Sequence, residues 1–131
     1  MELTKEALLK RFKEDAQFFI EKAFVVIDKQ TNKLIRFKLN KIQQKYWDEH
    51  SNFDYIIKSR KGGISTFNIA RFIWKCNFYN NQRAIMLCQN QDATVKMFRE
   101  RVKPLVQNCI WPMNVVMKES EGMLEFPDTG S

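Results

Sequence analysis

The sequence predicts an α/β domain, because strand-like and helix-like segments alternate along its middle part. Aromatic and β-branched residues at 53–57 are typical of a short strand. After a loop, the stretch 67–78 is apolar on most sides, as expected of a helix packed deep against a sheet. Residues 83–89 contain a near-continuous apolar run, which is typical of a strand buried on both faces of a parallel sheet. Strand, loop, helix and strand in this order predict a right-handed βαβ unit.

The segment before this unit predicts a helix, a hairpin and a second, short helix. Apolar side chains recur at helical spacing over 4–22. Residues 24–27 and 34–39 have strand-like composition, and a turn-rich segment joins them. Asn40 suits a helix N-cap, so a short helix is expected over 41–49.

The segment after the unit predicts one more helix and two more strands. The helix is expected to be capped by Asn90 or Asp92, and Pro104 should bend or end it. Three apolar residues form its buried stripe: Val95, Phe98 and Val102. Residues 115–118 and 123–126 are predicted as strands on either side of a glycine-containing turn.

Length and composition are consistent with a soluble protein of a single domain, residues 1–131. No apolar run approaches the roughly 20 residues that a membrane-spanning helix needs. The N-terminus has no basic segment leading into an apolar run, so no signal peptide is expected. Three widely spaced cysteines and one histidine predict neither a zinc cluster nor a disulfide framework. A reduced, cytosolic setting is therefore expected.

The net charge of +7 is compatible with a polyanionic partner. Residues 29–47 contain six cations and no acid: Lys29, Lys33, Arg36, Lys38, Lys41 and Lys45. Because Arg36 and Lys38 alternate with apolar residues, one interpretation is the solvated face of a strand. The other interpretation is a surface that faces phosphates, and the sequence favours neither.

The loop 58–66 has most of the parts of a phosphate-binding loop. Such loops lie between a strand and a helix, where backbone N–H groups and the helix dipole favour an anion. Gly62 and Gly63 allow close approach to phosphates, and Ser65 with Thr66 opens the helix. Three cations crowd the front of the loop and repel one another unless an anion neutralises them: Lys58, Arg60 and Lys61.

One position departs from the usual phosphate-loop pattern. Ile64 stands where a lysine normally precedes the serine. The alternative interpretation is therefore a plain Gly-Gly turn between a strand and a helix.

Three segments, taken in order, resemble the N-terminal part of the large terminase subunit of tailed bacteriophages. The run 57–66 is similar to that family's variant phosphate loop, in which an arginine stands early and a non-lysine residue precedes the serine. Residues 37–43 resemble its adenine-recognition segment, which ends in a glutamine. Residues 124–131 resemble the Gly-Ser turn before its acidic strand. Together these marks span 37–131.

The resemblance implies a partial P-loop NTPase (RecA/ASCE-like) three-layer sandwich with an N-terminal helix and a β-hairpin, binding ATP and Mg²⁺. It assigns the phosphate charge to Arg60, with Lys58 and Lys61 as alternative replacements for the missing lysine. It assigns Mg²⁺ to Ser65 and adenine to Gln43. The implied nucleotide-binding set is Gln43, Ser59, Arg60, Lys61, Gly62, Gly63, Ile64, Ser65 and Thr66. Gln43 has a second interpretation, as the partner of Asn40 in a capping box.

P-loop ATPases also need a strand that ends in an acidic residue. No apolar run here ends in an acidic pair, so the chain is expected to be a front portion that stops before that strand. The resemblance implies that the full-length protein hydrolyses ATP to drive double-stranded DNA into a procapsid and carries a further nuclease domain.

Its implied partners are double-stranded DNA, portal protein, small terminase subunit and copies of itself in a ring, in the cytoplasm of the bacterial host and without membrane contact. Two other functions stay open. They are a helicase-like P-loop ATPase and a non-enzymatic basic DNA-binding module.

Overall fold

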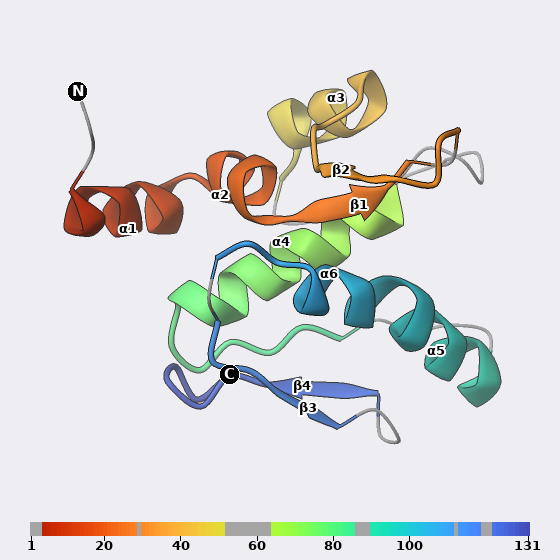
Figure 1. Cartoon of the computed structure of the whole chain (residues 1–131). Coiled ribbons are helices and arrows are strands. Elements are labelled where there is room, and N and C mark those ends of the chain that lie inside the picture. The colour runs from red at the N-terminus through yellow and green to blue at the C-terminus, as the bar shows by residue number, and fades with distance from the viewer. Residues whose placement is uncertain (1–3, 29, 52–63, 86–89, 112, 119–121) are drawn as a thin grey trace.

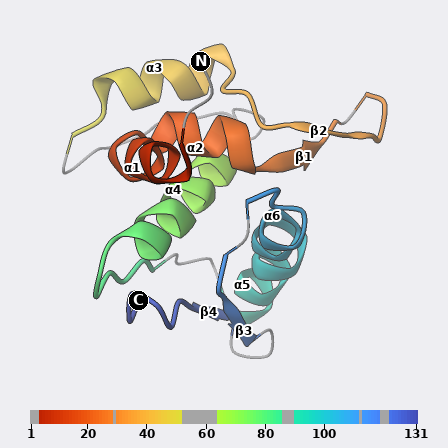
Figure 2. The same cartoon turned by 60° about the vertical axis from the view of Figure 1, so that its left-hand side comes forward.

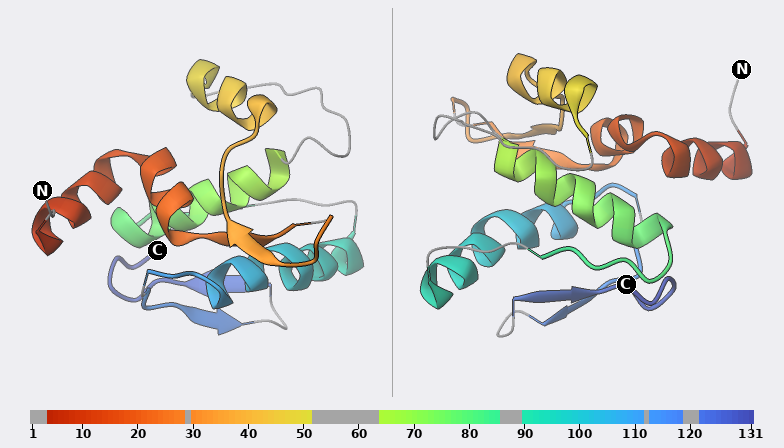
Figure 3. Two further views of the ribbon diagram at one scale, coloured as in Figure 1. Left: turned by 45° about the horizontal axis from the view of Figure 1, so that its top comes forward. Right: turned by 180° about the vertical axis from the view of Figure 1, so that it is seen from behind.

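The computed structural model describes residues 4–28, 30–51, 64–85, 90–111, 113–118 and 122–131. These residues form a mixed α and β structure that is mainly helical and contains two small antiparallel sheets. Helix α4 (Ile64–Phe78) runs through the middle (Figures 1 and 3). Helices α1–α3 and the strands β1 and β2 lie on one side of α4, and α5, α6 and the strands β3 and β4 lie on the other. No helix in the described ranges is both long and apolar enough to cross a bilayer.

The predicted N-terminal helix is confirmed, but it is divided into α1 (Lys5–Glu14) and α2 (Ala16–Ala23). Asp15 between them has an extended backbone. Its carboxylate accepts a hydrogen bond from the Phe18 N–H at 3.1 Å, which caps α2. The short side chain of an aspartate therefore ends one helix and starts the next.

The predicted hairpin and the helix after it are also confirmed. Strands β1 (Val25–Ile27) and β2 (Leu34–Arg36) pair antiparallel, with Val26 opposite Ile35. Helix α3 (Lys41–Glu49) follows, and Asn40 is its N-cap. The turn between the strands contains Asn32 with a φ of 55°, a conformation that asparagine tolerates better than most residues.

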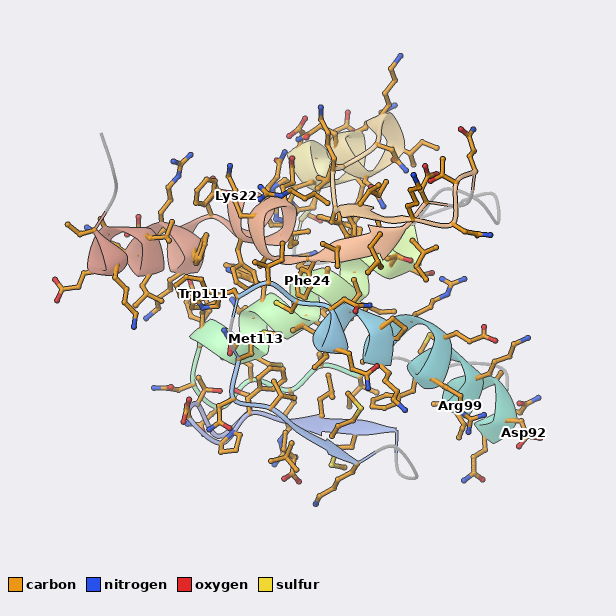
Figure 4. All side chains as sticks on the ribbon, in the orientation of Figure 1. Lys22, Phe24, Asp92, Arg99, Trp111 and Met113 are labelled. Atoms are coloured by element: carbon orange, nitrogen blue, oxygen red, sulfur yellow. The ribbon has the colours of Figure 1, made fainter. Side chains whose placement is uncertain are left out.

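Aromatic side chains fill the core between α1, α2 and α4. The Phe12 and Phe19 rings meet edge to face with centroids 5.1 Å apart, and Phe19 makes a similar contact with Phe78. The Trp74 indole N–H donates to the Phe12 carbonyl at 2.6 Å, so that this buried polar group has a partner. Phe24 is fully buried and lies between β1 and α4 (Figure 4).

The predicted second helix is a continuous helical run of three parts: α5 (Gln91–Met97), the π-helix η1 (Phe98–Val102) and α6 (Lys103–Gln107). Asn90, not Asp92, caps it, because the Asn90 Oδ1 accepts from the Ala93 N–H at 2.8 Å. Phe98 and Val102 are buried on the predicted stripe, and Val95 is half-buried.

Pro104 does not end this helical run, which continues to Gln107. Proline has no N–H to donate and its ring crowds the carbonyl four residues earlier. The π-turn of η1 stands directly before it and widens the helix where that bond is missing.

The two C-terminal strands are confirmed as β3 (Val116–Lys118) and β4 (Met123–Glu125), which pair antiparallel. Gly122 directly precedes β4 and has a φ of 61°, which residues other than glycine and asparagine rarely adopt. Figure 2 shows this hairpin below α5 and α6.

A parallel βαβ unit is not found among the described residues. Both strand pairs there are antiparallel, and residues 53–57 and 86–89 of the predicted strands lie outside the described part of the chain. Ala84 and Ile85, which were expected to be doubly buried in a strand, are irregular and exposed, with Ile85 77% exposed. An apolar run predicts a buried strand only where neighbouring strands cover it, and none of the described strands covers these two residues.

Candidate nucleotide-binding site

The predicted phosphate loop meets the described structure at the first turn of α4. Six of its residues lie outside the described ranges: Lys58, Ser59, Arg60, Lys61, Gly62 and Gly63. Ile64, Ser65 and Thr66 are the first three residues of α4. The first N–H groups of a helix have no intrahelical partner, and the helix dipole is positive there. Ile64, the first described residue of α4, follows the glycine pair in the sequence, in the order that is typical of a phosphate-binding loop.

The side chains of this first turn differ in how deeply they are buried. Phe67 is fully buried, whereas Ser65 and Thr66 are half-buried. Asn68 lies three residues after Ser65, on the same side of the helix. The Asn68 Oδ1 is buried without a hydrogen-bond partner among the described groups. The sequence analysis missed this residue, although an amide inside the apolar stretch 67–74 was a visible signal.

Gln43 takes part in the capping box of α3. The Asn40 Oδ1 accepts from the Gln43 N–H at 2.8 Å, and the Gln43 Oε1 accepts from the Asn40 N–H at 2.9 Å. Gln43 is 5% exposed and is the buried polar residue of the described core. A bidentate contact of a glutamine with adenine uses both ends of its carboxamide. Adenine contact by Gln43 would therefore share or replace the bond that its Oε1 makes to Asn40.

Helix α3 packs on the first turns of α4. The Phe67 ring lies 6.0 Å from the Tyr46 ring and 5.7 Å from the Trp47 ring, centroid to centroid. One turn further along α4, Arg71 donates to the Tyr46 hydroxyl at 3.3 Å, and its guanidinium lies 5.2 Å from the Trp47 ring centroid. These contacts hold the helix that carries Gln43 beside the N-terminal turns of α4.

A pair of glutamines connects α3 to α2. The Gln17 amide donates to the Gln44 Oε1 at 2.7 Å, and the Gln44 amide donates back to the Gln17 Oε1 at 3.1 Å. Because α2 also packs on α4, the three helices support one another. Neither this pairing nor the contacts of Arg71 were predicted from the sequence.

The C-terminal Gly-Ser turn lies at the other end of α4. The Thr129 hydroxyl donates to the Cys76 carbonyl at 2.5 Å, and the Ser131 hydroxyl donates to the Tyr79 carbonyl at 3.0 Å. A helix of 15 residues is about 22 Å long. The turn at Gly130 and Ser131 is therefore a docked structural turn and not part of the candidate nucleotide site.

Gly130 itself has a φ of 69°, and a Cβ added there would lie 3.2 Å from the Asn81 Oδ1. This position of the turn therefore requires glycine.

Ser65, the residue expected to bind Mg²⁺, lies in the described part of the chain. Mg²⁺ in nucleotide sites takes one or two protein ligands and completes its shell with phosphate oxygens and waters. A half-buried hydroxyl in the first turn of α4 fits that donor set. Within the described ranges no three His, Cys, Asp or Glu side chains form a metal-binding group.

Burial raises the pKa of the Cys76 thiol, so this cysteine is a poor ligand or nucleophile.

Comparison with known proteins finds no matching family, curated protein or solved structure. The terminase resemblance therefore depends on the motifs of the sequence itself.

Proposed function

We propose that this chain is the ATP-binding part of a P-loop ATPase of the kind found in viral DNA-packaging motors. The observation that supports this most is the junction at α4. In the sequence, a cation-rich segment with two glycines precedes Ile64, the first described residue of α4, and the glutamine-bearing helix α3 packs on the first turns of α4 through Phe67.

In this proposal, the loop and the start of α4 hold the phosphates. The backbone N–H groups from Gly62 to Thr66 supply donors, and Arg60 supplies a positive charge to the transferring phosphoryl group. Lys58 or Lys61 supplies the charge that the usual lysine would give. When Mg²⁺ is bound, it neutralises phosphate charge, and the Ser65 hydroxyl would hold it.

The motor role of the full-length protein comes from the terminase resemblance alone. ATP hydrolysis in the complete enzyme would drive double-stranded DNA into a procapsid, and copies of the subunit would work as a ring. The described part of the chain contains α4, whose start is proposed to bind phosphates, and α3, whose Gln43 is proposed to contact adenine.

Calorimetric titration of MgATP into the 131-residue chain tests the proposal. Arg60→Ala should weaken binding at least about tenfold, because a charge-assisted contact to phosphate is lost. Lys58→Ala and Lys61→Ala should differ in their loss of MgATP affinity, with a large loss in one variant and a small loss in the other. Lys10→Ala, at an exposed site on α1, is the matched control and should bind like the wild type. A folded wild type that does not bind ATP, or an Arg60→Ala variant that binds equally well, would contradict the proposal.

A further inference from the structure

The β1–β2 hairpin exposes aliphatic side chains on both of its faces. Ile27 and Leu34 are cross-strand partners and are 57% and 56% exposed. Side chains alternate along a strand, so Ile35 points to the opposite face, where it is 46% exposed. A two-stranded hairpin is marginally stable in water unless one of its faces is covered. This hairpin therefore has apolar surface suited to contact with another molecule.

Exposed cations surround these aliphatic side chains. Lys33, Arg36 and Lys38 lie on or beside β2, and all three are exposed. Among the described residues these three cations form no ion pair, whereas Lys118 forms one with Glu125. Figure 4 shows side chains with nitrogen ends projecting around this hairpin and α3.

The acids that flank this cationic stretch are engaged in their own segments. Asp28 accepts from the Gln30 N–H at 3.1 Å and from the Thr31 hydroxyl at 3.0 Å, within its turn. Asp48 accepts from the Gln44 amide at 2.9 Å, within α3. Among the described residues, neither acid forms an ion pair with Lys33, Arg36 or Lys38.

The β3–β4 hairpin provides an internal comparison. Val116 and Met123 are 42% and 43% exposed there, a similar apolar exposure. Lys118, however, forms an ion pair with Glu125 across the strands at 3.0 Å. The two hairpins thus expose comparable aliphatic surface, but the cation of β3 is neutralised within its own hairpin.

We propose that the β1–β2 hairpin is a docking surface for an acidic protein segment that carries aliphatic side chains. We call its residues the basic hairpin surface: Ile27, Lys33, Leu34, Arg36 and Lys38. Protein interfaces combine an apolar centre with a polar rim, and complementary charge selects the partner. This proposal rests on the hairpin alone and does not depend on nucleotide binding at α4.

Two other occupants fit the surface less well. A second copy that used the same surface would bring like charges together, which is unfavourable. Single-stranded nucleic acid is held by exposed aromatic rings as well as by cations, but Phe37 in this segment is 3% exposed. Duplex DNA would use the cations and leave Ile27 and Leu34 without a role.

A binding assay with defined probes tests the proposal on the whole 131-residue chain. The first probe is a fluorescent peptide in which glutamate alternates with isoleucine and valine. The second has glutamine in place of each glutamate, and the third is a short DNA duplex. The acidic peptide should bind more tightly than both others at the same salt concentration.

Paired variants locate the binding. Ile27→Ser with Leu34→Ser should weaken peptide binding about tenfold, as the loss of a central apolar contact does. Val116→Ser with Met123→Ser, on the other hairpin, should change it less than about twofold. Arg36→Gln with Lys38→Gln should weaken it, whereas Lys5→Gln with Lys10→Gln on α1 should not. Thermal melts identify variants that have lost the fold. If Ile27→Ser with Leu34→Ser unfolds, the Arg36→Gln with Lys38→Gln variant still tests the surface, because it keeps both aliphatic side chains.

Two results would overturn the proposal. One is peptide binding that is equally strong in the hairpin variants and their controls. The other is tighter binding of the DNA duplex that only the cation variants weaken, which would make the surface a nucleic-acid interface.

Discussion

Asn40 and Gln43 each bind the other's backbone N–H at the start of α3, with distances of 2.8 and 2.9 Å. This reciprocal pair is a capping box, and it satisfies two N–H groups that a helix end would otherwise leave unpaired. The pair confirms one of the two roles that the sequence indicated for Gln43. The adenine role stays a prediction, and a matched pair of variants separates the two.

We predict that Asn40→Ala and Gln43→Ala both lower the free energy of unfolding by about 1 kcal/mol, because each removes half of the cap. Only Gln43→Ala should also reduce the preference for ATP over GTP. Urea melts and competition binding on the same two variants measure both effects. An unchanged base preference in Gln43→Ala would leave Gln43 with the capping role alone.

Phe67→Ala should destabilise the protein by about 3–5 kcal/mol, because it opens a cavity where α3 packs on α4. Phe67 is fully buried and contacts both Tyr46 and Trp47. Phe72→Ala is the matched control on the same helix and should cost less, since Phe72 is only half-buried. Chemical denaturation of both variants gives the comparison. Equal losses would show that Phe67 has no special part in holding α3.

The sequence predicted local structure well wherever a few neighbouring residues determine it. Asn40 with Gln43 three residues later predicted the start of α3, and Asn90, one of two predicted caps, starts α5. Strand-like composition on either side of a turn predicted both hairpins, although β2 ends at Arg36 and not at residue 39. These features depend on caps, turns and composition, which are local properties of the chain.

The break at Asp15 was not predicted, although its cause is local: its carboxylate caps α2 while the apolar spacing continues on either side. Elsewhere the sequence predicted less because distant contacts decide the outcome. The run at 84–85 was expected to be buried, but burial of a strand depends on neighbours that the run itself does not specify. In the candidate site, Asn68 and Arg71 were missed because their importance comes from packing against α3 and the core.

The 131-residue chain alone should not hydrolyse ATP at a measurable rate. In the sequence no apolar run ends in the acidic pair that completes the metal site of a P-loop ATPase, so Ser65 is the one metal ligand that we propose. Groups of that kind act in the transition state, so their absence lowers turnover more than binding. Phosphate release from purified protein measures this, with Arg60→Ala as the control for a contaminating ATPase. Turnover that Arg60→Ala abolishes would show that a carboxylate in this chain is catalytic.

Any affinity of the chain for DNA should be weak, independent of sequence and sensitive to salt, because it would come from lysines and arginines meeting phosphates. Five exposed cations on and beside β2 and α3 are available: Lys33, Arg36, Lys38, Lys41 and Lys45. If these five cations make the phosphate contacts, the slope of log K against log salt should be about −4.5. Titrations of two unrelated duplexes at several salt concentrations measure it. Tight or sequence-selective binding would contradict this expectation.

Amide chemical-shift mapping of the ¹⁵N-labelled chain with MgATP tests most directly whether the loop before α4 binds phosphates. We predict the largest shifts at residues 58–66, including Ser65 and Thr66. Inorganic pyrophosphate with Mg²⁺ should shift the same amides, because the loop is proposed to bind the phosphates rather than the base. The region of Gly130 and Ser131, at the far end of α4, should stay unchanged. Shifts confined to other surfaces, or no shifts at saturating MgATP in the folded protein, would contradict the account.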